Sequence, residues 1–165
     1  MRTKKLTTLG LSVALALILS YVESLLPPLV AVPGVKAGLP NVVILFLLWR
    51  YGWKEAGAVS LIRLLLSAAL FTGFAAFFYG LAGAALSLAG SALLKRTGRF
   101  SPLGVSAAGG VLHNLGQIAL AALILDSGYI FAYLPVLLLS GTAAGALVGL
   151  LAGILIRRTD VGRKV

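Results

Sequence analysis

The chain has 165 residues, of which 60% are apolar and 11% are charged, so it is too hydrophobic for a soluble domain. It contains no cysteine, which excludes disulfides and thiolate metal sites. Its net charge of +10 does not indicate nucleic-acid binding, because the lysines and arginines gather in short clusters at the ends of apolar runs. The composition predicts an all-α polytopic membrane protein with one integral membrane domain over residues 1–165, in contact with the lipid bilayer.

The apolar runs predict six transmembrane helices, at about residues 6–26, 39–50, 55–71, 74–94, 102–125 and 133–156. The second run is short, and we expect the loop before it to complete its depth. The first run also resembles a signal peptide, because a basic start precedes Ala14 and Ala16. Since the run continues to Leu26, we favour an uncleaved first span.

The basic residues predict the orientation of these spans. With a cytoplasmic N-terminus, 12 of the 14 lysines and arginines fall in cytoplasmic segments. Both termini are then cytoplasmic in a multi-pass protein of the cell membrane. The loop between the first two spans and the turn at Asp126 face outward. That loop contains Pro27, Pro28 and Pro33, which break helices, so we expect a structured loop folded over or into the bundle.

Small residues recur every four positions in three of the spans. They are Ser12, Ala16 and Ser20 in the first span, Ala76, Gly80 and Ala84 in the fourth, and Gly141, Gly145, Gly149 and Gly153 in the sixth. Such ridges allow close approach of another helix backbone. Two interpretations stay open, since the ridges could pack inside the bundle or dock a partner membrane protein.

Polar residues within the membrane are the candidates for function, because they are costly to bury without a partner. The candidates for ligand binding are Glu23, Lys36, Asn41, Arg63, His113, Asn114 and Gln117. His113 and Gln117 share a helix face, so the patch around them is either an interhelical hydrogen-bond cluster or one wall of a small-molecule site. Arg63 either pairs with Glu23 or, like Lys36, attracts an anionic ligand.

The sequence offers no catalytic or cofactor motif. A single histidine without cysteine predicts no metal site, and we expect no cofactor. There is no glycine-lysine loop for ATP hydrolysis. The four acidic residues are scattered, so no aspartate cluster can hold magnesium and a diphosphate. We therefore expect that the protein is not an enzyme.

Two segments, PGVKAGLPN and GGVLHNLGQ, resemble the motifs of the Gx transporter family, whose members are also labelled heptaprenyl diphosphate synthase component I. The loop motif is met by Pro33, Gly34, Lys36, Gly38, Leu39 and Asn41, and the helix motif by Gly109, Gly110, His113, Asn114, Gly116 and Gln117. Pro40 departs from the small residue expected there. Pro33, Gly34 and Gly38 would shape the loop.

This family is similar to the substrate-binding (S) components of energy-coupling factor transporters, which are six-helix bundles with cytoplasmic termini. The resemblance implies a substrate-binding component of a small-molecule uptake transporter, with the outer loop as a lid over the ligand. It also implies that the first-span ridge contacts a coupling membrane subunit and that separate ATPases supply energy. The alternative is a non-catalytic membrane subunit associated with isoprenoid or quinone metabolism, as the heptaprenyl diphosphate label suggests.

Overall fold

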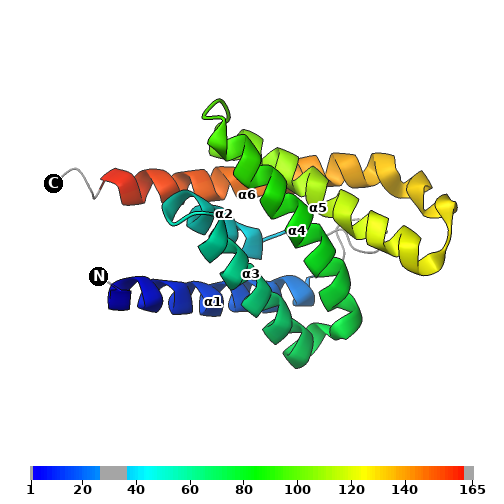
Figure 1. Ribbon diagram of the computed structural model, residues 1–165, viewed down its shortest axis with the longest axis horizontal. Helices are drawn as coiled ribbons and strands as arrows, with labels where there is room; N and C mark the ends of the chain where they lie inside the picture. The colour runs from blue at the N-terminus through cyan, green and yellow to red at the C-terminus, as the bar shows by residue number, and fades with distance from the viewer. Residues whose placement is uncertain (1, 27–36, 162–165) are drawn as a thin grey trace.

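The computed structural model describes residues 2–26 and 37–161, and within them the chain forms six α-helices (Figure 1). This confirms the prediction of an all-α fold with six helices. A π-helical turn, η1, follows the third helix, and a 3-10 turn, η2, precedes the sixth. In chain order the elements are α1 (Arg2–Leu25), α2 (Pro40–Arg50), α3 (Trp53–Ser67), η1 (Ala68–Thr72), α4 (Phe74–Arg96), α5 (Pro102–Leu125), η2 (Gly128–Tyr133) and α6 (Leu134–Val161).

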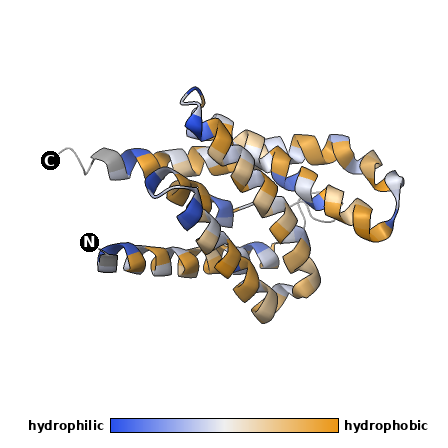
Figure 2. Cartoon of the chain, in the orientation of Figure 1, coloured by the Kyte–Doolittle hydropathy of each residue, from blue (hydrophilic) through white to orange (hydrophobic). Residues whose placement is uncertain are grey.

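Five of these helical segments are long and apolar enough to cross a bilayer, so the chain is a multi-pass membrane protein. Figure 2 shows apolar residues along the helices and hydrophilic ones at the start of α1 and between α4 and α5. Large apolar side chains such as Leu6, Leu123 and Leu139 are exposed on the outside of the bundle, where lipid would cover them. The helices begin and end near the bounds of the predicted spans, but the π-helical turn was not predicted.

The remaining helix, α2, is buried and too short to span a membrane on its own, so the structure supports five of the six predicted transmembrane helices. Its 11 residues extend about 16 Å, roughly half of the ~30 Å hydrocarbon core. It lies among α1, α3 and α6, and Leu47 is completely buried there. Pro40 stands in its first turn, where a missing N–H leaves no helix bond unmade. The departure from the family motif at Pro40 therefore fits the start of a helix.

Both ends of the described chain lie at the same end of the bundle, as Figure 1 shows. The Lys5 Nζ atom is 2.5 Å from Oε1 of Glu55, and it lies 5.8 Å from the centre of the Tyr51 ring. Nearby, Lys95 donates to the carbonyl of Leu48 at 2.7 Å, at the end of α2. Three of the predicted cytoplasmic basic segments are thus neighbours, and we expect this end to face the cytoplasm.

The glycine ridge of α6 packs against α5 inside the bundle. A Cβ atom added to Gly145 would lie 2.3 Å from the Ser106 carbonyl oxygen, and one on Gly149 would lie 2.6 Å from the Cα of Leu103. One on Gly141 would lie 2.8 Å from the Gly110 carbonyl oxygen. The helix backbones are therefore in contact along this ridge, and at these three glycines the interpretation as a docking surface for a partner is wrong. Gly153 lies nearest Pro102 of α5.

The ridge of α1 is also internal. Ser12 and Ser20 are buried and Ala16 is fully inaccessible, in the contact of α1 with α2 and α3. The expectation that this ridge contacts a coupling subunit is therefore wrong. Its small side chains instead let α1 approach the neighbouring helices, as small residues do in membrane bundles.

Candidate functional site

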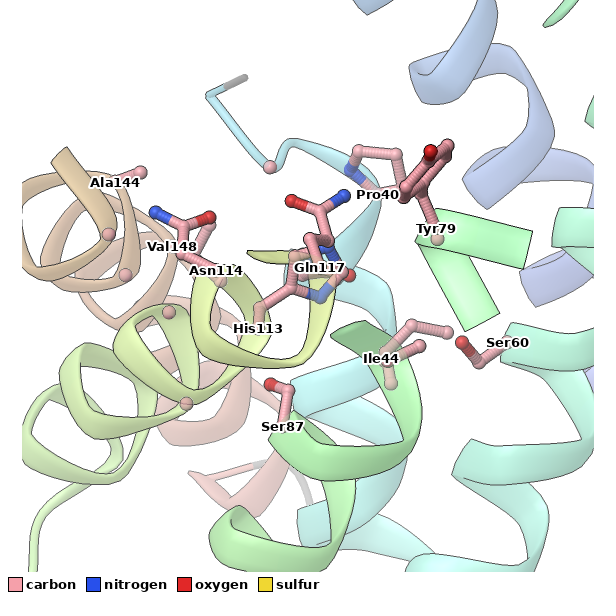
Figure 3. A pocket seen from close by; sticks show the side chains of 18 of the residues that line it. Pro40, Ile44, Ser60, Tyr79, Ser87, His113, Asn114, Gln117, Ala144 and Val148 are labelled. Atoms are coloured by element: carbon pink, nitrogen blue, oxygen red, sulfur yellow. The ribbon is translucent and has the colours of Figure 1, made fainter. Parts of the chain in front are cut away.

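A cavity of about 720 Å³ lies inside the bundle, and residues from all six helices line it. This volume falls in the range of sites that hold vitamin- or drug-sized molecules. Ile44 of α2 and Val148 of α6 contribute apolar surface, and His113 and Gln117 of α5 contribute polar groups (Figure 3). The cavity thus combines an apolar lining with a few polar groups, which is typical of a small-molecule site.

The structure brings together every predicted ligand-binding residue that it describes. Six of the seven candidates line the one cavity: Glu23, Asn41, Arg63, His113, Asn114 and Gln117. The seventh, Lys36, and the loop residues Pro33 and Gly34 lie outside the described residues. Gly38 also lines the cavity, and its φ of 75° is a conformation that favours glycine. Ligand binding by these residues stays a prediction, but their convergence is a property of the fold.

The two interpretations of the polar patch on α5 apply to different residues. Asn114 is buried and donates from Nδ2 to the Leu137 carbonyl oxygen of α6 at 2.7 Å, which is an interhelical hydrogen bond. His113 and Gln117 form no hydrogen bond within the described part of the chain, and Figure 3 shows them on the cavity side of α5. They are therefore free to bind a ligand, whereas Asn114 holds two helices together.

Glycines fix the position of this patch. A Cβ atom on Gly83 of α4 would lie 2.8 Å from the His113 carbonyl oxygen, and one on Gly116 would lie 2.5 Å from the Ala82 carbonyl oxygen. On the other side, a Cβ atom on Gly110 would lie 2.1 Å from the Gly141 carbonyl oxygen. Because backbone touches backbone on both sides, α5 is clamped between α4 and α6. The glycines of the GGVLHNLGQ segment thus hold its polar side chains in place.

Glu23 anchors the chain at the start of α2. Its Oε1 atom accepts hydrogen bonds from the backbone N–H groups of Gly38 and Leu39, the latter at 3.3 Å. A carboxylate at a helix N-terminus is favourable, because unpaired N–H groups and the positive end of the helix dipole meet it there. No direct ion pair joins Glu23 to Arg63 among the described residues, but Glu23 lies near enough to attract the Arg63 charge electrostatically.

Arg63 is buried, with 9% of its surface exposed, and it lines the cavity from α3. Its Nη1 group donates one long hydrogen bond, of 3.4 Å, to Ser20 Oγ of α1. Its Nε atom has no hydrogen-bond partner among the described residues. The guanidinium group, which stays charged in proteins, is therefore only weakly satisfied by its surroundings.

Sequence reasoning missed the serines of this site. Ser60 and Ser67 stand three residues before and four residues after Arg63, so all three lie on one face of α3. That spacing around an intramembrane arginine was a signal that could have identified them. The complete set of serines in the lining is Ser20, Ser60, Ser67, Ser87, Ser91, Ser106 and Ser140. Of these, Ser60, Ser87, Ser91 and Ser106 have no hydrogen-bond acceptor in the described part of the chain.

The polar groups of the cavity are suited to hydrogen bonding with a small molecule rather than to metal coordination. Within residues 2–26 and 37–161, no three histidine, aspartate or glutamate side chains come close enough to hold a metal ion. The polar lining consists mainly of neutral amide, hydroxyl and imidazole groups, with the guanidinium of Arg63 and the backbone-bonded carboxylate of Glu23. Such groups can orient a molecule by hydrogen bonds.

The fold and the cavity together define a polytopic helical membrane protein whose internal cavity has a mainly apolar lining with a few polar groups. The sequence model of the heptaprenyl diphosphate synthase component I family matches residues 12–155, which is most of the chain. The protein therefore belongs to the heptaprenyl diphosphate synthase component I family. No curated protein and no solved structure matches the chain at a significant level.

Proposed function

We propose that this protein is the substrate-binding membrane component of a small-molecule uptake transporter of the energy-coupling factor type. The observation that carries the proposal is the 720 Å³ cavity into which unbonded polar side chains converge from several helices. Polar groups within a membrane are costly unless they have partners, so such a set is best explained by a ligand that bonds to them. We further propose that the protein is not itself an enzyme.

Energy would come from partner chains in this proposal: a coupling membrane subunit and separate ATPases. Because the ridge of Ser12, Ala16 and Ser20 is buried, the coupling subunit would contact other surfaces of the bundle. Those surfaces carry exposed apolar side chains, which suit either lipid or a membrane partner. Glu23 bonds to the backbone at Gly38, in the lining of the cavity, whereas the loop predicted to cover the ligand lies mostly outside the described residues.

The family description favours a second candidate, a non-catalytic membrane subunit for isoprenoid or quinone metabolism. Apolar residues of the cavity, such as Leu45, Leu88 and Ile118, would accommodate part of a prenyl chain. This candidate predicts that adding the protein to a prenyl-transferase partner changes product length or rate.

The test identifies the bound molecule and then follows its uptake. Detergent-purified protein is extracted, and the small molecules released are compared by mass spectrometry between the wild type and a His113→Ala/Gln117→Ala double variant. We expect one vitamin-sized compound that is depleted at least about tenfold in the variant, because two bonding groups are lost. Leu123→Ala is the matched control, because Leu123 lies on the outside of the same helix.

The identified compound, isotopically labelled, is then offered to cells that make the wild type or the double variant. Uptake that requires the wild-type protein and falls in the variant supports transport. Normal binding and uptake in the double variant would contradict the site. A bound prenyl or quinone compound, together with a changed prenyl-transferase rate, would favour the second candidate.

A further inference from the structure

We propose that the ligand carries a single carboxylate, which binds at Arg63, and neutral polar groups that bind along α5. This inference rests on the proposed function and names the ligand class of the same cavity. Arg63 is the one arginine or lysine among the described residues that line the cavity. Its charge cannot be removed by deprotonation, so a buried Arg63 needs an anion.

Among the described residues, the protein places no anion in direct contact with Arg63. Arg63 makes one long hydrogen bond, to Ser20, although a guanidinium group can donate five. Glu23 attracts the Arg63 charge electrostatically, but it forms no direct ion pair with Arg63, and its Oε1 atom is bonded to the backbone at Gly38 and Leu39. A negative group in the cavity would complete the bonding of Arg63.

The surroundings of Arg63 suit a carboxylate. Ser60, one turn before Arg63 on α3, has a hydroxyl with no acceptor among the described residues and lines the same cavity. A carboxylate accepts hydrogen bonds from both guanidinium and hydroxyl groups, and the charged bonds are the stronger ones. Arg63 and Ser60 therefore provide two donors for one anionic group.

The charge of the site limits how negative the ligand can be. A diphosphate carries several negative charges, and proteins usually balance them with several cations or a metal ion. The described lining offers one guanidinium group, and Glu23 adds a negative charge. A monoanion matches this balance better than a diphosphate does.

The rest of the cavity indicates the other end of the molecule. His113 and Gln117 of α5 and Asn41 of α2 are neutral or titratable groups that make no hydrogen bond to described residues through their side chains. Together they can donate to and accept from carbonyl, amide or hydroxyl groups. The site thus fits an uncharged polar end on α5 and a carboxylate on α3, joined by an apolar part beside Ile44 and Leu64.

The test uses two probes of the same shape, benzoate and benzamide, with inorganic pyrophosphate as a third. Thermal unfolding of the full-length protein in detergent is followed at constant ionic strength. Benzoate near ten times its dissociation constant is expected to raise the Tm by about 3–5 °C. Benzamide, which lacks the charge, and pyrophosphate, which carries too much of it, are expected to give smaller shifts.

Arg63→Gln is the decisive variant, and Arg99→Gln is its control because Arg99 is exposed outside the cavity. Arg63→Gln should lose the benzoate shift, whereas Arg99→Gln and the charge-preserving Arg63→Lys should retain all or part of it. Without ligand, Arg63→Gln should be at least as stable as the wild type, because it removes a poorly matched buried charge. An arginine with a purely structural role would give a lower Tm instead.

Several results would overturn the inference. They are an equal benzoate shift in Arg63→Gln, a larger shift with pyrophosphate than with benzoate, and no benzoate shift in the wild type. A neutral compound that co-purifies with both the wild type and Arg63→Gln would also overturn it while leaving the proposed function intact. If no compound co-purifies, the proposed function is weakened, and the benzoate series still decides the role of Arg63.

Discussion

The two walls of the cavity are built differently. On the wall formed by α4, α5 and α6, backbones touch at glycines, and a Cβ atom on Gly110 would lie 2.1 Å from the Gly141 carbonyl oxygen. On the wall formed by α1, α2 and α3, polar side chains connect the elements, through Glu23 to the start of α2 and through Arg63 to Ser20. The first wall leaves no space between helices, whereas the second contains an incompletely bonded charge.

The two walls would therefore have different roles in binding. One holds polar side chains in place, and the other would change when a ligand binds. The glycine-packed wall holds His113 and Gln117 in fixed places before a ligand arrives, which limits the entropy cost of binding. If the proposed anion binds Arg63, the other wall gains bonds that it lacks without ligand, and ligand binding would stabilise that wall more. A binding component that signals occupancy to a partner needs such a difference between its two states.

The largest expected effect comes from filling the contact between α5 and α6. Gly110→Ala should destabilise the protein by about 3 kcal/mol, the upper end of the usual cost of overpacking, because the added methyl group meets backbone atoms. Gly10→Ala is the matched control, since nothing lies within 4 Å of its new methyl group. It should stabilise α1 slightly, by up to about 1 kcal/mol. The stabilities are measured by denaturant unfolding in detergent. Equal stability of the two variants would contradict the close backbone contact between α5 and α6.

The next prediction concerns the wall formed by α1, α2 and α3. Glu23→Ala removes the acceptor of the Gly38 and Leu39 amides, and hydrogen bonds to charged groups contribute about 1.5–3 kcal/mol. Hydrogen exchange of these amides should therefore accelerate by about tenfold or more. Glu55→Ala, at the other end of the bundle, should leave their exchange unchanged. Unaltered exchange in Glu23→Ala would show that other contacts hold the start of α2.

A smaller effect distinguishes two neighbours on α5. Asn114→Ala should lower stability by about 0.6–1.7 kcal/mol, from the average to the maximum measured for hydrogen bonds between membrane helices, because the bond to Leu137 is lost. Gln117→Ala should change stability less, since Gln117 has no hydrogen-bond partner among the described residues, but it should weaken ligand retention. The reverse order of stabilities in unfolding experiments would mean that the roles of these amides are exchanged.

The smallest expected effect concerns the ion pair at the end of the bundle where both termini of the described chain lie. Glu55→Gln breaks the ion pair with Lys5, which lies partly exposed to solvent. Exposed ion pairs contribute below about 1 kcal/mol, so the unfolding midpoint should barely move. A large loss of stability would indicate that contact between α1 and α3 depends on this pair.

Sequence periodicity predicted the features that are set within a single helix. It located the helices, placed His113 and Gln117 on one face, and identified intramembrane polar residues that prove to line one cavity. It did not predict that Glu23 bonds to the backbone at Gly38, because that contact joins two elements whose relative position is a property of the packed bundle.

The same limit applies to the small-residue ridges. A four-residue spacing predicts a surface for close approach, but it does not say which neighbour occupies that surface. The ridge at Ala16 was assigned to a partner subunit by resemblance, whereas α2 and α3 cover it in the structure. The direction of each ridge follows from the packing of all six helices and could not be read from one of them.

Native mass spectrometry can show directly whether the cavity holds a small molecule. The purified wild type is compared with a variant in which a large side chain fills the cavity. Ala144 of α6 lines the cavity, as Figure 3 shows, and its neighbour Ala143 is exposed on the outside of the same helix. We expect a small-molecule adduct on the wild type and on Ala143→Phe, and no adduct on Ala144→Phe. An adduct that persists on a folded Ala144→Phe variant would contradict the account, because the molecule would then bind elsewhere.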